Sequence, residues 1–90
     1  MEKVLIVDDS PLQAMQLKSI LDSDYDVTCV HTPEMGLSYA SSGDYSLILL
    51  DVVMPGMDGF MLLKKLQEEV FTQHIPVILI TSLADIEHEE

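Results

Sequence analysis

The stretch that decides the fold is Val4-Leu5-Ile6-Val7-Asp8-Asp9, an aliphatic run that ends in two acidic residues. A second run of the same kind, Leu47-Ile48-Leu49-Leu50, ends in Asp51. Short runs without polar interruptions are typical of strands buried on both faces of a parallel sheet. Parallel strands end at the same edge of their sheet, where open α/β sheets bind ligands. We therefore expect the carboxylates of Asp8, Asp9 and Asp51 to lie close together.

Signals for helices and strands alternate along the rest of the chain. Ser10 and Thr32 are residue types that cap helix N-termini, and each is followed by a proline, which fits the first position of a helix. We expect helices after these caps and from Phe60 onward, and strands over residues 4–7, 26–30, 46–50 and 77–80. Such alternation predicts an α/β fold with a doubly wound, mostly parallel sheet and helices on both faces.

Two of the expected helices carry an apolar stripe. Residues spaced three and four apart fall on one side of a helix, and an apolar side packs against the sheet. In the first helix the stripe consists of Ala14, Leu17, Ile20 and Leu21. In the third it consists of Phe60, Leu63, Leu66 and Val70. We expect both helices to face the sheet with these residues.

Composition excludes some classes of partner. The chain has 90 residues, which is the length of one domain. Its sixteen acidic and four basic residues give it a net charge of -12. This charge argues against binding to nucleic acid or to an anionic membrane. The single Cys29 permits no intrachain disulfide, and no apolar run approaches the roughly 20 residues of a membrane helix. A cytoplasmic location is the simplest expectation, with a basic or metal-bearing partner.

The acidic cluster itself suggests a metal site. Several carboxylates at one sheet edge repel one another unless a cation or hydrogen-bond donors relieve the repulsion. A hard divalent cation with oxygen ligands is the natural occupant of such a cluster. Thr81 follows the last expected strand, residues 77–80, and so would bring a hydroxyl group to the same edge.

With the loop Met54-Pro55-Gly56-Met57-Asp58-Gly59 after Asp51, these motifs resemble the receiver domain of two-component response regulators. The resemblance runs in order along essentially all of residues 1–90. It implies a flavodoxin-like, CheY-like three-layer α/β/α fold. It also implies a signalling function in a phosphorelay, in which the domain accepts a phosphoryl group and assists its own phosphorylation and dephosphorylation but is not an enzyme acting on other molecules.

The resemblance assigns roles to five residues. Asp51 would be the phosphoacceptor, and Asp9, Asp51 and the backbone carbonyl of Val53 would bind Mg²⁺ directly. Asp8 would bind the ion largely through a water molecule, and Thr81 would be the hydroxyl that moves toward the phosphoryl group. The implied phosphodonor is a phosphohistidine on a sensor histidine kinase or a phosphotransfer protein, and an output domain would follow in the parent chain.

The sequence also departs from the family pattern. A full receiver has a fifth strand that ends in a lysine and two further helices, and none of these is recognisable in residues 1–90. We therefore expect a C-terminally incomplete receiver of about four strands and three helices, lacking strand five and helix five. An alternative function follows: a truncated scaffold, impaired in phosphotransfer, that forms a homodimer through the exposed edge of strand four.

Three other functions stay open as alternatives. A phosphohydrolase of the haloacid dehalogenase type would have a second Asp two residues after the nucleophile, where this chain has Val53. A flavodoxin-like nucleotide binder would follow its first strand with a phosphate-binding loop, where Asp8 and Asp9 would repel phosphate. A degenerate receiver would act only as a docking module.

Overall fold

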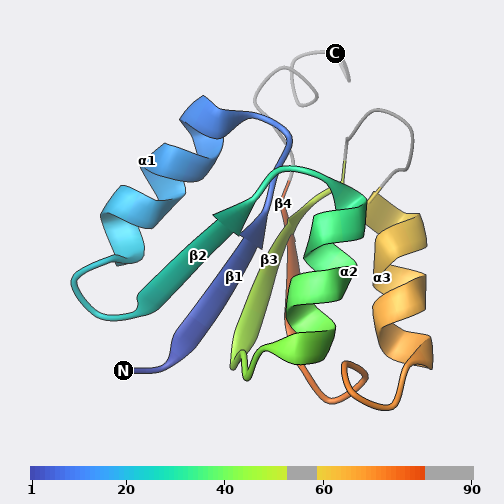
Figure 1. The fold of residues 1–90 in the computed structure, drawn as a ribbon. Helices are drawn as coiled ribbons and strands as arrows, with labels where there is room; N and C mark the ends of the chain where they lie inside the picture. The colour runs from blue at the N-terminus through green and yellow to red at the C-terminus, as the bar shows by residue number, and fades with distance from the viewer. Residues whose placement is uncertain (53–58, 81–90) are drawn as a thin grey trace.

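The computed structural model describes residues 1–52 and 59–80, in which strands and helices alternate (Figure 1). The elements are β1 (Lys3–Val7), α1 (Pro11–Leu21), β2 (Asp26–Val30), α2 (Pro33–Ser42), β3 (Leu47–Asp51), α3 (Gly59–Glu68) and β4 (Val77–Ile80). The predicted α/β class is confirmed. The third strand begins and ends one residue later than expected, so that Asp51 is its last residue.

All neighbouring strands are parallel, in the order β2-β1-β3-β4. The chain goes from β1 outward to β2 and then returns to the other side of β1 to form β3. The direction of winding therefore reverses between β1 and β3, and in open α/β sheets ligands bind outside the carboxyl ends of the strands at such a point.

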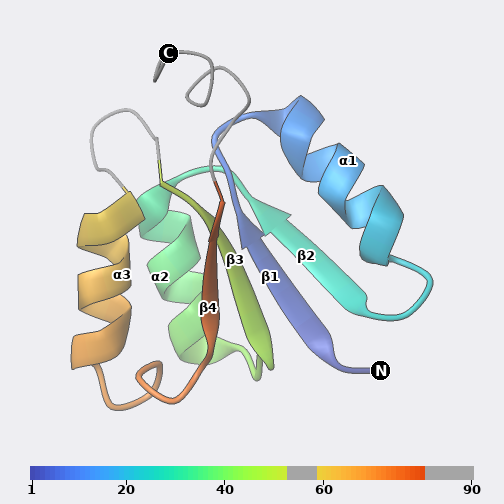
Figure 2. The same ribbon diagram turned by 180° about the vertical axis from the view of Figure 1, so that it is seen from behind.

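Helices cover both faces of the sheet, as predicted, and each face has its own hydrophobic core. Helix α1 packs on one face, and α2 and α3 pack on the other, where Figure 2 shows them behind the sheet. The core under α1 contains Val4, Ile6, Ala14, Val27 and Leu49. The core under α2 and α3 contains, among others, Leu5, Val7, Ile48, Leu50, Leu62 and Leu66.

The predicted helix caps are present. The Ser10 hydroxyl accepts a hydrogen bond from the backbone N–H of Gln13 (3.3 Å), and the Thr32 hydroxyl accepts one from the N–H of Met35 (3.1 Å). Both helices begin with the proline that follows the cap. Helix α2 ends at Ser42, and Gly43 is its C-cap.

The apolar stripes were predicted only in part. Ile20 is 71% exposed, because it lies about a quarter turn away from the side of α1 formed by Ala14, Leu17 and Leu21. In α3 the buried side is formed by Leu62 and Leu66 together with Gly59, and Leu63 packs at its margin.

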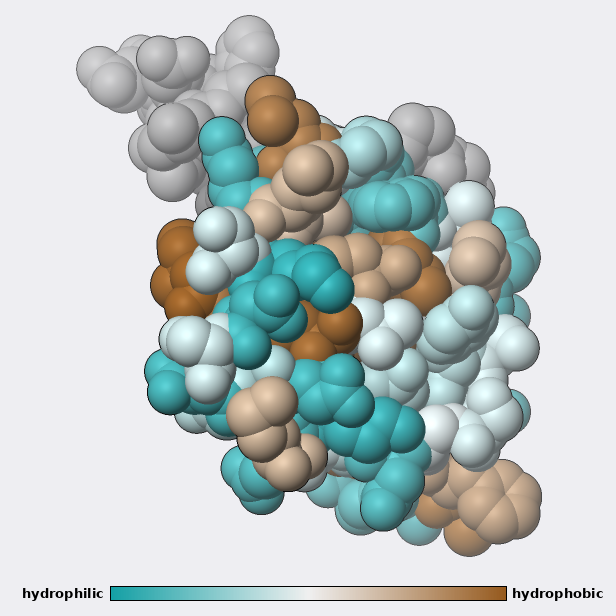
Figure 3. Space-filling view, turned by 60° about the vertical axis from the view of Figure 1, so that its left-hand side comes forward, coloured by the Kyte–Doolittle hydropathy of each residue, from teal (hydrophilic) through white to brown (hydrophobic). Residues whose placement is uncertain are grey.

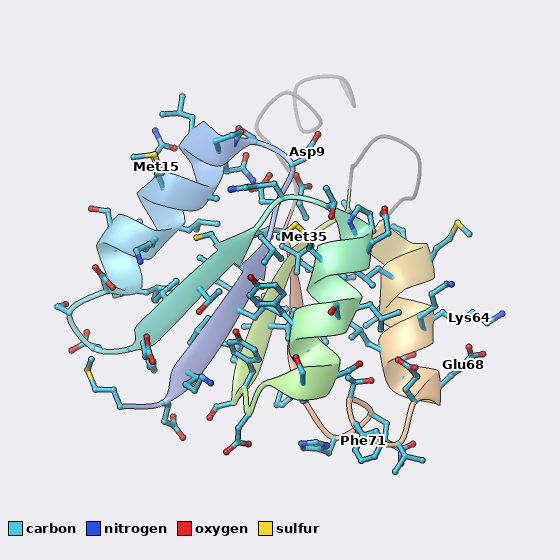
Figure 4. The ribbon with its side chains drawn as sticks, viewed as in Figure 1. Asp9, Met15, Met35, Lys64, Glu68 and Phe71 are labelled. Atoms are coloured by element: carbon cyan, nitrogen blue, oxygen red, sulfur yellow. The ribbon has the colours of Figure 1, made fainter. Side chains whose placement is uncertain are left out.

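The expected contributions of Phe60 and Val70 to the third stripe were wrong. Phe60 is 58% exposed on another side of the helix, and Val70 lies beyond the end of α3 at Glu68 and is 73% exposed. Lys64 and Glu68 point away from the sheet, as Figure 4 shows.

The face of the molecule drawn in Figure 3 is largely hydrophilic. In Figure 3, which brings the left-hand side of Figure 1 forward, hydrophobic residues form separate patches among hydrophilic ones. At the sheet edge formed by β4, Ile78 and Leu79 are 52% and 38% exposed. Among the described residues, none of the helices has the length and apolar character needed to cross a membrane.

Candidate acidic site at the carboxyl edge of the sheet

Two neighbouring strands bring the acidic residues together. Val7 of β1 is paired with Leu50 of β3, so the residues that follow them, Asp8 and Asp51, lie at the same level at the carboxyl edge of the sheet. One carboxylate oxygen from each of Asp8, Asp9 and Asp51 lies within 4.8 Å of the others. The expectation that these three residues share one site is confirmed.

The three carboxylates differ in their contact with solvent. Asp8 and Asp51 are buried, with 0% and 4% of their surface exposed, whereas Asp9 is exposed. Figure 4 shows Asp9 beyond the carboxyl end of β1, where the chain turns toward α1. Charges interact more strongly where water is excluded, so repulsion in this cluster falls mainly on the two buried members. A cation would reach them from the side on which Asp9 lies.

Asp8 is held by four hydrogen-bonding contacts with four residues, two through its carboxylate and two through its backbone. Its Oδ1 accepts from the backbone N–H of Ser10 (2.9 Å), and its Oδ2 accepts from the side-chain Nε2 of Gln13 (2.6 Å). Its backbone N–H donates to the carbonyl of Val30 (3.0 Å), and its own carbonyl lies 2.9 Å from Nδ1 of His31. Because a carbonyl oxygen can only accept, Nδ1 of His31 carries the proton in this contact. These contacts fix both the backbone and the carboxylate of Asp8.

Sequence reasoning missed two of these partners. Neither His31 nor Gln13 was identified from the sequence as part of the site. One sequence signal does mark Gln13, since Ser10 and Gln13 have the S-x-x-Q spacing of a capping box. Nothing in the sequence links His31 to Asp8, because that contact depends on the pairing of β1 with β2.

Gly59 fixes the backbone at the other half of the site. It is the first residue of α3, whereas the sequence placed it in the preceding loop. A Cβ atom on Gly59 would lie 2.5 Å from the carbonyl oxygen of Asp51 and 2.5 Å from Cα of Val52. The Gly59 N–H also donates to the carbonyl of Val52 (2.9 Å). A side chain at position 59 would therefore force the end of β3 and the start of α3 apart.

Two residues of the expected site, Val53 and Thr81, lie outside the described residues. The residues immediately before them, Val52 and Ile80, are hydrogen bonded through their backbones at 3.0 Å. The roles expected for Val53 and Thr81 remain predictions.

The donor set fits a small divalent cation. Mg²⁺ prefers oxygen ligands at about 2.0–2.1 Å, so two oxygens on opposite sides of one ion are roughly 4.2 Å apart. The oxygens of Asp8, Asp9 and Asp51 lie within 4.8 Å of one another. Small side-chain movements that shorten this oxygen–oxygen distance by roughly 0.6 Å would bring them to the spacing of Mg²⁺ ligands. Three carboxylates at this spacing suit Mg²⁺ better than a cation that prefers nitrogen or sulfur ligands.

Comparison with known proteins places the chain in one family. Residues 4–90 match the family model of the response regulator receiver domain. The chain is 40% identical over 82 residues to the response regulator PleD of Caulobacter vibrioides, covering 90% of this chain and 18% of PleD. It is 34% identical over 83 residues to the protein PilH of Pseudomonas aeruginosa, covering 91% of this chain and 69% of PilH. The chain thus spans most of PilH but less than a fifth of PleD.

A solved structure gives the same result. The response regulator protein TrrA of Thermotoga maritima, crystallised in complex with Mg²⁺-BeF, superimposes with a TM-score of 0.84 at 28% sequence identity. The superposition covers 99% of this chain and 76% of the TrrA chain. The described fold is therefore similar to that of a protein crystallised in complex with Mg²⁺-BeF.

Proposed function

The chain belongs to the response regulator receiver family, and from that premise we propose that it is a phosphorylation-dependent signalling domain of a two-component phosphorelay. Asp51 is the phosphoacceptor in this proposal. One observation carries it: the almost fully buried carboxylate of Asp51 ends β3 at the switch point of the sheet, within 4.8 Å of the carboxylates of Asp8 and Asp9. A lone carboxylate would repel an anionic phosphodonor, and this cluster attracts the cation that removes the repulsion.

The metal ligands follow from the same cluster. Asp8, Asp9, Asp51 and the backbone carbonyl of Val53 hold Mg²⁺ in this proposal. When bound, the ion supplies positive charge that offsets the charge of the phosphoryl oxygens during transfer. The similarity to TrrA, whose structure contains Mg²⁺, supports this assignment.

The transfer step itself uses the carboxylate of Asp51. One carboxylate oxygen attacks the phosphorus atom, an O–P bond forms, and the P–N bond to the donor histidine breaks with its electron pair returning to the imidazole. The product is an acyl phosphate on Asp51. The backbone of β3, fixed against Gly59, holds the nucleophile in place for in-line attack. The Thr81 hydroxyl then donates a hydrogen bond to the new phosphoryl group.

The partners are proposed from the family. The phosphodonor is a sensor histidine kinase or a phosphotransfer protein in the cytoplasm, and the phosphorylated state acts on a partner protein or on an output domain of a longer parent chain. The strongly negative net charge of -12 favours contact surfaces that are basic over nucleic acid or membrane surfaces.

The proposal is tested by the intact mass of the protein after incubation with a small acyl phosphate and Mg²⁺. We expect a single phosphoryl adduct in the wild type, and none in an Asp51→Asn variant or after chelation of Mg²⁺. Circular dichroism of each sample shows whether it is folded. An adduct that persists in Asp51→Asn would contradict the assignment of the phosphoacceptor. A folded wild type without any adduct would favour the impaired scaffold or the docking module.

A further inference from the structure

The start of α1 has the sequence of a capping box, but two of its groups bind the carboxylate of Asp8 in place of each other. In the usual arrangement, the Gln at the third helical position reaches back to the backbone N–H of the cap residue. Here the cap is Ser10, and its N–H donates instead to Oδ1 of Asp8 at 2.9 Å. The side chain of Gln13 donates to the other oxygen, Oδ2 of Asp8, at 2.6 Å. The carboxylate of Asp8 thus stands between the two groups that normally bind each other.

Two contacts on two different oxygens fix how the carboxylate of Asp8 is rotated about its Cβ–Cγ bond. Asp8 is 0% exposed, so its carboxylate relies on hydrogen-bond donors of the protein rather than on bulk water. Of these two donors, the backbone N–H at position 10 is present with any residue except proline. The side-chain amide at position 13, in contrast, depends on the residue being Gln13. The Gln13 amide is neutral and leaves the negative charge of Asp8 available to a cation.

We propose that Gln13 is a positioning residue of the metal site. Its side chain holds the Asp8 carboxylate in the orientation in which Asp8, Asp9 and Asp51 can bind the same Mg²⁺ ion. Each carboxylate oxygen has two lone pairs, so an oxygen that accepts from Gln13 keeps one for a metal-bound water or the ion. Partners that orient metal ligands in this way typically change metal affinity 10- to 100-fold when they are removed. This inference rests on the proposed function, since it takes the acidic cluster to be a Mg²⁺ site.

The choice of residue type at position 13 fits this role. A lysine there would place a positive charge against Asp8 and compete with the metal ion, and a glutamate would add a fourth negative charge to the cluster. A leucine would be similar in size but would leave Oδ2 of Asp8 without this donor. Gln13→Leu is therefore the informative substitution. Gln16→Leu is the matched control, because Gln16 lies exposed on the same helix.

The test is Mg²⁺ affinity of the unphosphorylated protein, measured by isothermal titration calorimetry. We expect Gln13→Leu to raise the dissociation constant about tenfold and Gln16→Leu to leave it unchanged. Thermal unfolding in a chelator shows which variants are folded at the temperature of the titration. An affinity of folded Gln13→Leu within twofold of the wild type would overturn the inference.

A double-mutant cycle separates positioning from a general effect on the fold. If Gln13 acts through Asp8, Gln13→Leu causes no further loss of affinity in an Asp8→Ala background, measured with Mg²⁺ at high millimolar concentrations. An equal loss in both backgrounds would overturn the inference, because Gln13 would then act by another route. The proposed function is judged separately: a folded wild type that binds no Mg²⁺ contradicts it, whereas a wild type that binds Mg²⁺ with Gln13→Leu unchanged contradicts only the role of Gln13.

Discussion

Adjacent residues in this domain can differ strongly in their exposure to solvent. Asp8 and Asp9 are adjacent, yet one is fully buried and the other is exposed. The buried residue is fixed by hydrogen bonds, whereas the exposed one is in contact with solvent. In the proposed Mg²⁺ site, the adjacent pair would therefore combine a carboxylate held by the protein with one that is open to solvent.

The environment of Cys29 makes a pH-dependent contribution to stability. Burial raises the pKa of the Cys29 thiol above its usual value of 9.0; Lys18 partly opposes the rise, and Asp8 and Asp22 add to it. Between the two pKa values the unfolded chain has lost the thiol proton and the folded protein keeps it. The stabilisation is therefore present below the usual pKa and is lost as the pH rises through the raised value.

We expect the free energy of unfolding of the wild type to fall, relative to that of Cys29→Ala, as the pH rises above 9.0. Urea unfolding of both proteins at neutral pH and above this value measures the difference. Groups other than Cys29 titrate in both proteins, so their effect cancels in the comparison. Parallel curves for the two proteins across this range would show that the thiol does not contribute.

The acidic site could be predicted from single residues, but its supporting contacts could not. Asp8, Asp9 and Asp51 were predictable because each follows a recognisable strand and parallel strands end at one edge. The contact of His31 with Asp8 joins residues 23 positions apart and exists only because β2 pairs with β1. The close approach of Gly59 to Asp51 likewise depends on how α3 meets β3. Local sequence patterns do not carry such information.

At the scale of elements, the helix boundaries were more predictable than the helix faces. A cap residue followed by proline is a local signal, and it marked the starts of α1 and α2 correctly. Which side of a helix is buried depends on how the helix lies on the sheet. Phe60 and Ile20 are apolar and have the right spacing, yet both are largely exposed.

The C-terminal end of α3 depends on one buried hydroxyl group. Thr72 is 1% exposed, and its Oγ1 donates to the carbonyl of Leu66 at 2.6 Å. We expect Thr72→Val to lower the free energy of unfolding by about 1–3 kcal/mol, because the buried carbonyl loses its donor. Thr72→Ser keeps the hydroxyl and should cost about 0.8 kcal/mol for the lost methyl group.

Urea denaturation of Thr72→Val, Thr72→Ser and the wild type measures both effects. The order of stability should be wild type, then the serine variant, then the valine variant. If the valine variant is as stable as the wild type, the hydrogen bond to Leu66 does not hold this end of the helix.

At the scale of the whole molecule, the described sheet ends in an apolar strand. Ile78 and Leu79 of β4 are partly exposed, and an edge strand of this kind offers unpaired backbone groups to a second chain. We expect the 90-residue chain to form dimers through Val77–Ile80, and Ile78→Lys to weaken them, because a charge on an edge strand opposes pairing.

Sedimentation equilibrium of both proteins over a range of micromolar concentrations is the measurement. Phe71→Lys provides the control, because Phe71 is 74% exposed but lies in the segment before β4. A wild type that stays a compact monomer throughout this range would contradict dimer formation. An equal effect of the two lysine substitutions would show that added charge, and not the strand edge, controls association.

The two cores of this sheet have a consequence for insertions and deletions. Val4 and Ile6 of β1 face α1, and Leu5 and Val7 face α2 and α3, so odd and even positions belong to opposite sides of the molecule. The carboxylate of Asp8 continues the even series, and it accordingly meets Gln13 of α1. Gaining or losing one residue in β1 would move every later side chain of the strand to the opposite face of the sheet. The core residues after the change and the carboxylate of Asp8 would then point to the wrong side. A change of length by one residue in β1 would therefore disturb both cores and the acidic site in a single event.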